Sequence, residues 1–267
     1  MPELPEVNTL AVALARQLRG DSITEWHRLS PKLRLPIPGS KEARAIIGGK
    51  IVGIKRVAKN LYFDFAGELF LKAHLGMTGH FHLTPEPLKE LKHAHLRLKL
   101  QSGRILTFCD PRRFGSIEIT AFPDECVTEP FAGILTPQYL ATVCAKKQCS
   151  IKALIMDQQI IAGLGNIYAA EALFAAGIRP DRAAASLSRT ELKKLCQAII
   201  TVIDKAVKDG IASLTDQPEI DADTTHFEIT TLIYGQQGGL CSKCRKGTVE
   251  MVRIGGRSSC YCPLCQK

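Results

Sequence analysis

Four short segments decide the fold of the first half of the chain: LYFDF (61–65), ELFLKAH (68–74), AHLRLKL (94–100) and RILTF (104–108). Apolar and polar residues largely alternate along them, and turn-forming stretches such as Ala-Gly-Glu and Gln-Ser-Gly separate them. A period of two turns one face of a strand toward a core and the other toward solvent. We therefore expect an antiparallel sheet or sandwich from about residue 51 to 119.

Helical patterns precede and follow this region. Apolar residues recur at steps of three and four residues and predict a helix over 5–19: they are Val7, Leu10, Leu14 and Leu18. Pro5 suits its first turn and Gly20 its end. Further helices are predicted over 137–148, 150–160, 166–177 and 187–209, and strands over 228–234 and 247–254. The fold class is thus α+β, in more than one domain, with a linker near the Pro- and Glu-containing stretch 122–130.

Composition favours a polyanionic partner. The 267 residues carry 35 Lys and Arg against 26 Asp and Glu, a formal charge of +9, and 45% of them are apolar. No run of about 18 apolar residues predicts a membrane span, and MPELPEVNTL does not resemble a secretory signal. We therefore expect a cytoplasmic protein without membrane association, whose cysteines remain thiols or bind metal.

The charge is unevenly distributed. Residues 27–60 hold nine Lys or Arg against one Glu, a net charge of +8, and residues 241–267 have a net charge of +5. Residues 215–228 hold five acidic residues and no basic one. Two separated basic regions would hold phosphates by neutralisation and counterion release, although each run alone is equally well explained as a solvated face.

Two CxxC pairs lie 17 residues apart near the end of the sequence: Cys241, Cys244, Cys262 and Cys265. This spacing predicts one structural Zn²⁺ bound by four thiolates, with a hairpin between the pairs. About 27 residues cannot bury enough core to fold alone, so a metal is expected to stabilise them. Cys260 is a less regular rival ligand. The remaining five cysteines are predicted to be small core residues: Cys109, Cys126, Cys144, Cys149 and Cys196.

The first residues offer an unusual nucleophile. Removal of Met1 would expose the secondary amine of Pro2, whose reference pKa of about 8 leaves an appreciable fraction as free base at neutral pH. Such an amine can attack a sugar carbon and form an iminium, and Glu3 beside it can donate or accept a proton. Proline and acidic residues are also common at a helix start, so the residue types alone leave both interpretations open.

Five blocks occur here in one order: MPELPEV, HLGMTG (74–79), DPRRFG (110–115), GLGNIYAAEALF (163–174) and the four-cysteine unit. Together they resemble the formamidopyrimidine-DNA glycosylases, a bacterial base-excision repair family, over essentially the whole chain. The resemblance implies an N-terminal β-sandwich with a leading helix, a helix–two-turn–helix domain and a zinc hairpin. It also implies a monomer that binds double-stranded DNA containing an oxidised base, in the bacterial cytoplasm at the nucleoid.

The resemblance also implies roles for individual residues. Pro2 would attack C1′ of a flipped oxidised purine nucleotide, Glu3 would be the general acid, and Lys59 would lie near the phosphates and lesion. Two eliminations would then cut the strand. Three residues would fill the space left by the flipped base: Met77, Arg112 and Phe114. DNA contacts would come from His74, Arg112, Asn166 and Arg257.

The residue types also allow plainer roles. Core packing explains Met77 and Phe114, a solvated charge explains Arg112 and Arg257, helix capping explains Asn166, and a structural role explains His74.

We expect a catalytic domain at 1–125, a linker at 126–136, a helix–two-turn–helix domain at 137–227 and a zinc hairpin at 228–267. The segment 211–227 would cover the lesion, but it is acidic and lacks the glycine usual there. Asn8 replaces the glutamate that is usual in the family, and Ala58 replaces the usual glycine.

Three alternative functions remain: an oxidised-pyrimidine glycosylase of the endonuclease VIII type, a non-catalytic binder of damaged DNA and a zinc-finger regulator. The sequence MPEL at the start favours the purine branch over the pyrimidine branch.

Overall fold

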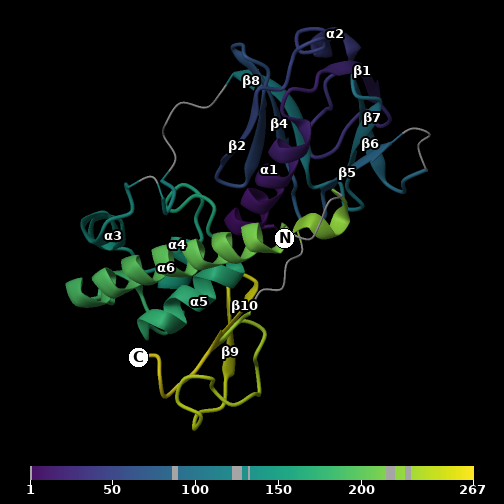
Figure 1. Ribbon diagram of the computed structural model, residues 1–267. Coiled ribbons are helices and arrows are strands. Elements are labelled where there is room, and N and C mark those ends of the chain that lie inside the picture. The colour runs from purple at the N-terminus through teal and green to yellow at the C-terminus, as the bar shows by residue number, and fades with distance from the viewer. Residues whose placement is uncertain (1, 86–89, 122–127, 132, 215–219, 226–229) are drawn as a thin grey trace. The chain divides into compact units, whose positions relative to one another are not determined.

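A computed structural model describes residues 2–85, 90–121, 128–131, 133–214, 220–225 and 230–267 (Figure 1). By its internal contacts the chain forms two compact units. The first comprises Met1–Cys126 and Val207–Phe227, and the second comprises Val127–Ala206 and Glu228–Lys267. No helix within the described ranges is long and apolar enough to cross a membrane.

The first unit is an antiparallel β-sandwich, as predicted. One sheet has the order β1-β6-β7-β5 and the other the order β2-β3-β4-β8. The first consists of β1 (Ile23–Arg28), β6 (Ala94–Leu100), β7 (Arg104–Cys109) and β5 (His80–Pro85). The second consists of β2 (Gly53–Val57), β3 (Asn60–Asp64), β4 (Leu69–His74) and β8 (Ser116–Ala121). Apolar side chains of both sheets, such as Phe63 and Phe108, share one buried core.

Helix α1 (Leu4–Leu18) packs against this core and along β2 (Figure 1). All four apolar residues that predicted it are fully buried. Strand β1 was not predicted, because its residues do not alternate between buried and exposed. Each buried residue of β1 is followed by two exposed ones. The small helix α2 (Ser40–Ala43) follows it.

Residues 207–227 belong to the first unit by their contacts, whereas the sequence assigned 137–227 to the second domain. Leu214 and Ile220 join the sandwich core, and the backbone of Ile220 pairs with Leu83 of β5. The short helix η3 (Ala222–Thr225) contacts α1 and β5. Apolar burial therefore attaches this segment to the sandwich; its residues 215–219 and 226–227 lie outside the described ranges.

The second unit is helical, as predicted: it contains α3 (Pro137–Cys144), α4 (Ile151–Ile155), α5 (Asn166–Ala176), η1 (Ala184–Ser186) and, up to Ala206, α6 (Arg189–Ser213). Side chains cap the starts of α3 and α4, where Thr136 and Ser150 accept N–H groups. Helix α3 ends earlier than predicted, before Lys146 adopts a left-handed backbone with φ of 60°. Helix α5 is buried on nearly all sides and ends at left-handed Gly177.

The predicted strand over 228–234 is wrong for its described part, because residues 230–234 form no strand. The N–H groups of Leu232, Ile233 and Tyr234 instead donate to the Glu171 carboxylate of α5, at 3.0, 3.0 and 2.8 Å. The strand predicted over 247–254 is shorter, as β9 (Glu250–Ile254), and pairs with β10 (Arg257–Tyr261) in the expected hairpin.

Candidate active site and metal centre

The first turn of α1 fixes the residues around the proposed nucleophile. Glu3 is the N-cap residue, and its N–H donates to Oε2 of Glu6 at 2.8 Å. The Glu3 carboxylate in turn accepts the N–H of Glu6, which completes a capping box. Both acidic residues are buried, and Pro5 lies in the first turn as predicted. Half-buried Pro2 therefore precedes a well-ordered helix start, where the helix dipole is positive.

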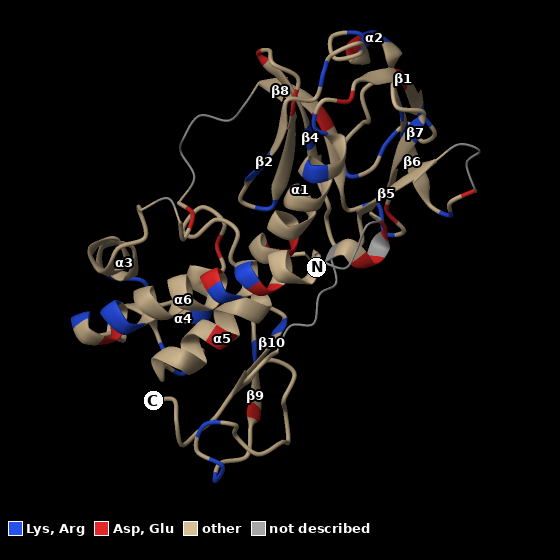
Figure 2. Cartoon of the chain, in the orientation of Figure 1, with Lys and Arg blue, Asp and Glu red and all other residues tan. Residues whose placement is uncertain are grey.

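Lys59 lies in the two-residue turn between β2 and β3, where Val57 pairs with Asn60. Its neighbour Ala58 has φ of 53°, a left-handed conformation that favours glycine. The side chain of Arg56 donates to the Ala58 carbonyl at 3.0 Å and to Oδ1 of Asn8 at 3.3 Å. The two departures from the family pattern, at positions 8 and 58, thus contact the same arginine. Figure 2 shows the basic residues of this hairpin.

His74 ends β4, where it pairs with Asn60 of β3. Its Nδ1 accepts the N–H of Gly76 at 3.0 Å. Burial, and then the positive charges of Arg34, Lys59 and Lys72, lower the pKa of His74 from 6.5 to about 4. The ring is therefore neutral at physiological pH and lies among cations. His74 thus has the structural role that the sequence left open, as an acceptor for the N–H of Gly76. A DNA contact by His74 stays a prediction.

Residues 74–79 and 110–115, here called the loop pair, approach each other backbone to backbone. A Cβ atom on Gly76 would lie 2.5 Å from the carbonyl carbon of Phe114, and Gly76 has φ of 62°. A Cβ on Gly115 would lie 2.8 Å from the carbonyl oxygen of His74. Only glycine fits such contacts, which explains two glycines of HLGMTG and DPRRFG.

Asp110 joins the two members of the loop pair, a role that the sequence analysis missed. Its fully buried carboxylate accepts the Thr78 hydroxyl at 2.5 Å and the N–H groups of Gly115 and Arg112 at 2.8 and 3.3 Å. The sequence held one signal for this role, because Asp110 is the single acidic residue in the otherwise basic segment DPRRFG. A buried carboxylate needs several hydrogen-bond donors around it.

The three proposed void-filling residues project from the loop pair. Met77 and Phe114 are 38% and 45% exposed, and Arg112 is exposed as well. The Arg112 guanidinium lies over the Phe114 ring, 4.8 Å from its centroid. Core packing, the alternative for Met77 and Phe114, does not occur. Two apolar side chains and a guanidinium held on a rigid support can fill a space left in a base stack.

Asn166 opens α5, and the N-cap is Gly165, so the alternative that Asn166 is the cap is wrong. Its Oδ1 is buried and has no hydrogen-bond partner among the described residues. The preceding turn is stabilised by Gln158, whose side chain accepts from Gly163 at 3.1 Å and donates to the Leu164 carbonyl at 2.8 Å. Gly163 has φ of 89°. The N–H groups at the start of a helix can bind an anion.

The four predicted ligands form one cluster in the second unit: Cys241, Cys244, Cys262 and Cys265. The Sγ atoms of Cys241 and Cys265, and those of Cys244 and Cys262, lie 3.8 Å apart. Tetrahedral Zn²⁺ with bonds of about 2.3 Å requires Sγ separations of roughly 3.8 Å, so the cluster fits this metal. Its neighbour Cys260 instead packs in the adjoining apolar core, and Arg257 lies at the exposed tip of the hairpin.

The other cysteines, which were predicted to be core residues, differ in their burial. Cys109, Cys144 and Cys196 are buried, as expected. Cys149 is exposed, so that prediction is wrong; it precedes the cap of α4 in a loop. Cys126 lies outside the described residues.

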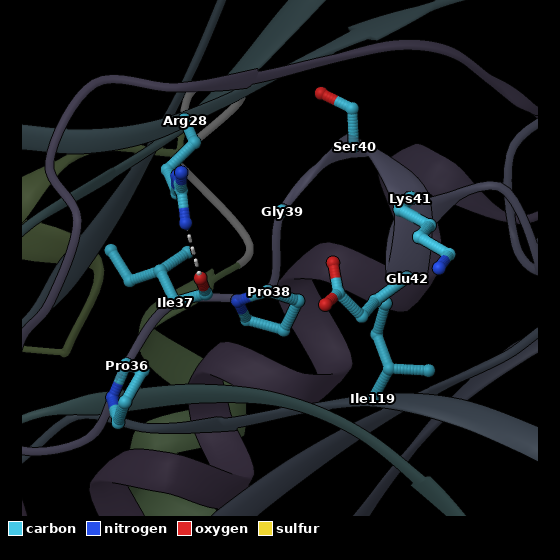
Figure 3. A pocket seen from close by; sticks show the side chains of 9 residues that line it. All are labelled: Arg28, Pro36, Ile37, Pro38, Gly39, Ser40, Lys41, Glu42 and Ile119. Carbon is cyan, nitrogen blue, oxygen red and sulfur yellow. Dashed lines mark hydrogen bonds between the residues drawn. The ribbon is translucent and has the colours of Figure 1, made fainter.

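A surface pocket of about 460 Å³ in the first unit is lined by Arg28, residues 36–42 and Ile119 (Figure 3). The Arg28 guanidinium donates to the Ile37 carbonyl at 3.2 Å within it. None of the predicted site residues lines this pocket.

Comparison with known proteins agrees with this geometry. Residues 1–117 match the formamidopyrimidine-DNA glycosylase N-terminal domain, and residues 127–217 match the H2TH domain of the same glycosylases. The fold and site thus define a DNA glycosylase of the helix–two-turn–helix class.

Individual relatives specify the family. A formamidopyrimidine-DNA glycosylase of Pelobacter propionicus is 38% identical over 275 residues, covering 100% of both chains. The Lactococcus lactis Fpg in complex with abasic-site DNA has a TM-score of 0.88 at 27% identity, covering 99% of each chain. The same enzyme with DNA containing N7-benzyl-Fapy-dG has a TM-score of 0.89 at 28% identity and full coverage of both. This chain belongs to the formamidopyrimidine-DNA glycosylase family.

Proposed function

We propose that this chain excises oxidised purines, such as 8-oxoguanine and formamidopyrimidines, from double-stranded DNA and then cleaves the strand at the abasic site. Membership of the family over its full length supports the glycosylase and lyase activities and the DNA partner. The match to the purine family also argues against the pyrimidine alternative. The proposal places the monomer in the bacterial cytoplasm with its DNA substrate.

In this proposal Pro2 is the nucleophile. Its secondary amine forms a bond to C1′ of the flipped nucleotide while the bond from C1′ to the base breaks and the base leaves. The amine proton passes to the departing base. Glu3 then donates a proton to the sugar ring oxygen, the bond from C1′ to that oxygen breaks, and the ring opens to an iminium. The iminium makes neighbouring sugar protons acidic, and two eliminations release the 3′ and 5′ phosphates. The helix start beside Pro2 supports the proposal, because its positive dipole disfavours the protonated amine.

The remaining residues hold the DNA. Met77, Phe114 and Arg112 fill the vacated space, and Arg112 donates to the unpaired base; their exposure on the rigid loop pair supports this role. Lys59 and His74 lie near the phosphates and lesion, and Asn166 and Arg257 bind phosphates. One structural Zn²⁺ on the four cysteines would order the hairpin that carries Arg257. We assign residues 1–125 to catalysis, 126–136 to a linker, 137–206 to the helix–two-turn–helix domain and 228–267 to the hairpin, with residues 207–227 packed on the catalytic unit.

Borohydride trapping on a duplex with one 8-oxoguanine opposite cytosine tests the nucleophile. The enzyme should form a covalent adduct that is lost in Pro2→Gly and on retention of Met1. Pro5→Ala is the matched control, because it alters a proline of the same turn without touching the amine, and it should still be trapped. An adduct that survives both changes at the first residue would assign the nucleophile to a lysine. A parallel duplex with an oxidised pyrimidine should be cut far more slowly.

A further inference from the structure

The outer face of one sheet carries a second cluster of metal-binding side chains. His80 and His82 of β5 and Cys109 of β7 each offer a ligand atom, and these atoms lie within 4.8 Å of one another. None of the three has a role in the proposed glycosylase reaction. We propose that they form a second metal site, in the first unit, suited to Zn²⁺ and separate from the four-cysteine cluster.

Strand register explains why these side chains meet. His80 lies directly opposite Cys109 in the antiparallel pair, and His82 lies opposite Thr107. Side chains that face each other across such a pair are on the same side of the sheet, and residues two apart on a strand share that side. Phe81, between the histidines, points to the other side and is buried in the core. The pairing therefore holds all three ligands on one face without any loop.

His80 is already oriented as metal-binding histidines usually are. Its Nδ1–H donates to the backbone carbonyl of Thr78 at 2.9 Å. This bond fixes the tautomer and leaves the lone pair of Nε2 available for a metal, the common arrangement of a histidine ligand and its supporting carbonyl. The rings of His80 and His82 meet edge to face with centroids 5.0 Å apart.

The surroundings favour a cation with an additional ligand. Thr107 is fully buried beside the histidines, and within the part of the chain that the structure describes its hydroxyl has no hydrogen-bond partner. A metal-bound water could supply one. Asp221 lies close enough to interact electrostatically with His82, and its negative charge favours a cation. Burial raises the pKa of the Cys109 thiol to about 11, and the positive charge of Arg97, which pairs with Thr107 from β6, acts in the opposite direction. A metal that binds here must therefore displace the thiol proton.

The donor set points to zinc rather than to calcium or magnesium. Two imidazoles and a thiolate suit Zn²⁺, whereas the hard cations require oxygen ligands. Around Zn²⁺ the ligand atoms would be about 3.3–3.7 Å apart, so the cluster must contract by roughly 1 Å. The half-exposed histidines on edge strand β5 can rotate by this amount, because their side chains are not enclosed in the core.

Metal stoichiometry of the full-length protein tests the proposal. After loading with Zn²⁺ and removal of excess metal, elemental analysis should find two equivalents per chain in the wild type and one in His80→Gln/His82→Gln and in Cys109→Ser. His27→Gln, which removes a histidine of β1 outside the cluster, is the matched control and should keep two. One equivalent in the wild type, unchanged in the variants, would overturn the proposal.

Co²⁺ substitution gives a readout that misfolding cannot imitate. The spectrum of the wild type minus that of the double histidine variant should show the d–d bands of a tetrahedral Co²⁺ site. Its thiolate-to-metal charge-transfer band should be about a quarter as intense as that of the four-cysteine site, because this site has one thiolate ligand instead of four. Circular dichroism should confirm that the variant is folded. A difference spectrum without these bands in a folded variant would exclude the site.

Discussion

The loop pair and the cysteine hairpin both present predicted DNA-contacting residues, but different forces hold them. Close backbone contacts at Gly76 and Gly115 and the buried carboxylate of Asp110 fix the loop pair on the sandwich. The hairpin segment has a small apolar core, a strand pair, four clustered thiols and backbone N–H groups that donate to Glu171. The comparison leads us to predict that packing and buried hydrogen bonds suffice to orient the void-filling residues, whereas the orientation of Arg257 would depend on a bound metal.

Metal removal should produce the largest difference between the two regions. Chelation is expected to unfold the hairpin, because structural zinc in small units contributes about 10–16 kcal/mol of binding free energy. Proteolysis should then cut near Arg253 and Arg257, while the β-sandwich stays protected and DNA affinity falls. Restoring Zn²⁺ should reverse these changes. A hairpin that stays protected after verified loss of the metal would show that its core suffices.

Gly76→Ala should strongly destabilise the loop pair. The new Cβ would overlap the Phe114 backbone at 2.5 Å in a left-handed conformation, and we expect a loss of about 3 kcal/mol in the free energy of unfolding. Gly67→Ala is the matched control, since its Cβ would meet no atom within 4 Å. Urea denaturation measures both, and equal stability of the two variants would refute the close-packed loop pair.

His74 should make the stability of the first unit depend on pH. Its pKa is about 4 in the folded protein and 6.5 when exposed, so the unfolded state binds the proton first as the pH falls. Stability is retained above pH 6.5 and decreases toward pH 4, by about 2 kcal/mol once solvent screening of the half-buried ring is allowed for. His74→Asn keeps an acceptor for Gly76 and should flatten this profile. A wild-type and a variant profile of the same slope would contradict the prediction.

Ala58→Gly should change the free energy of unfolding least, and it should stabilise the protein where the other changes destabilise it. Ala58 has a left-handed backbone, so glycine is expected to raise the free energy of unfolding by about 1 kcal/mol. Ala58→Val provides the contrast, because a β-branched side chain tolerates this conformation worse and should destabilise the protein. Thermal denaturation of both variants checks the prediction, and a glycine variant that melts below the wild type would contradict it.

Local patterns in the sequence predicted much of the fold because they carry their own geometry. Alternation predicted the sheets, three- and four-residue steps predicted α1, and CxxC spacing predicted the metal cluster. The errors arose where a distant partner decides the conformation. Leu232, Ile233 and Tyr234 have the composition of a strand, but their N–H groups bind Glu171, 61 to 63 residues earlier. Residues 207–227 join the sandwich because Leu214 and Ile220 are buried there.

The sequence by itself determined the class of fold, the family, the four cysteines of the cluster and the motifs that carry the proposed site. These features are repeats and spacings along the chain, and short-range geometry fixes them. Only the tertiary structure decided that Asp110 supports the loop pair, that Met77 and Phe114 are exposed, and that His80, His82 and Cys109 meet on one face. Each of these depends on strand register or on contacts between remote residues, which a one-dimensional pattern does not encode.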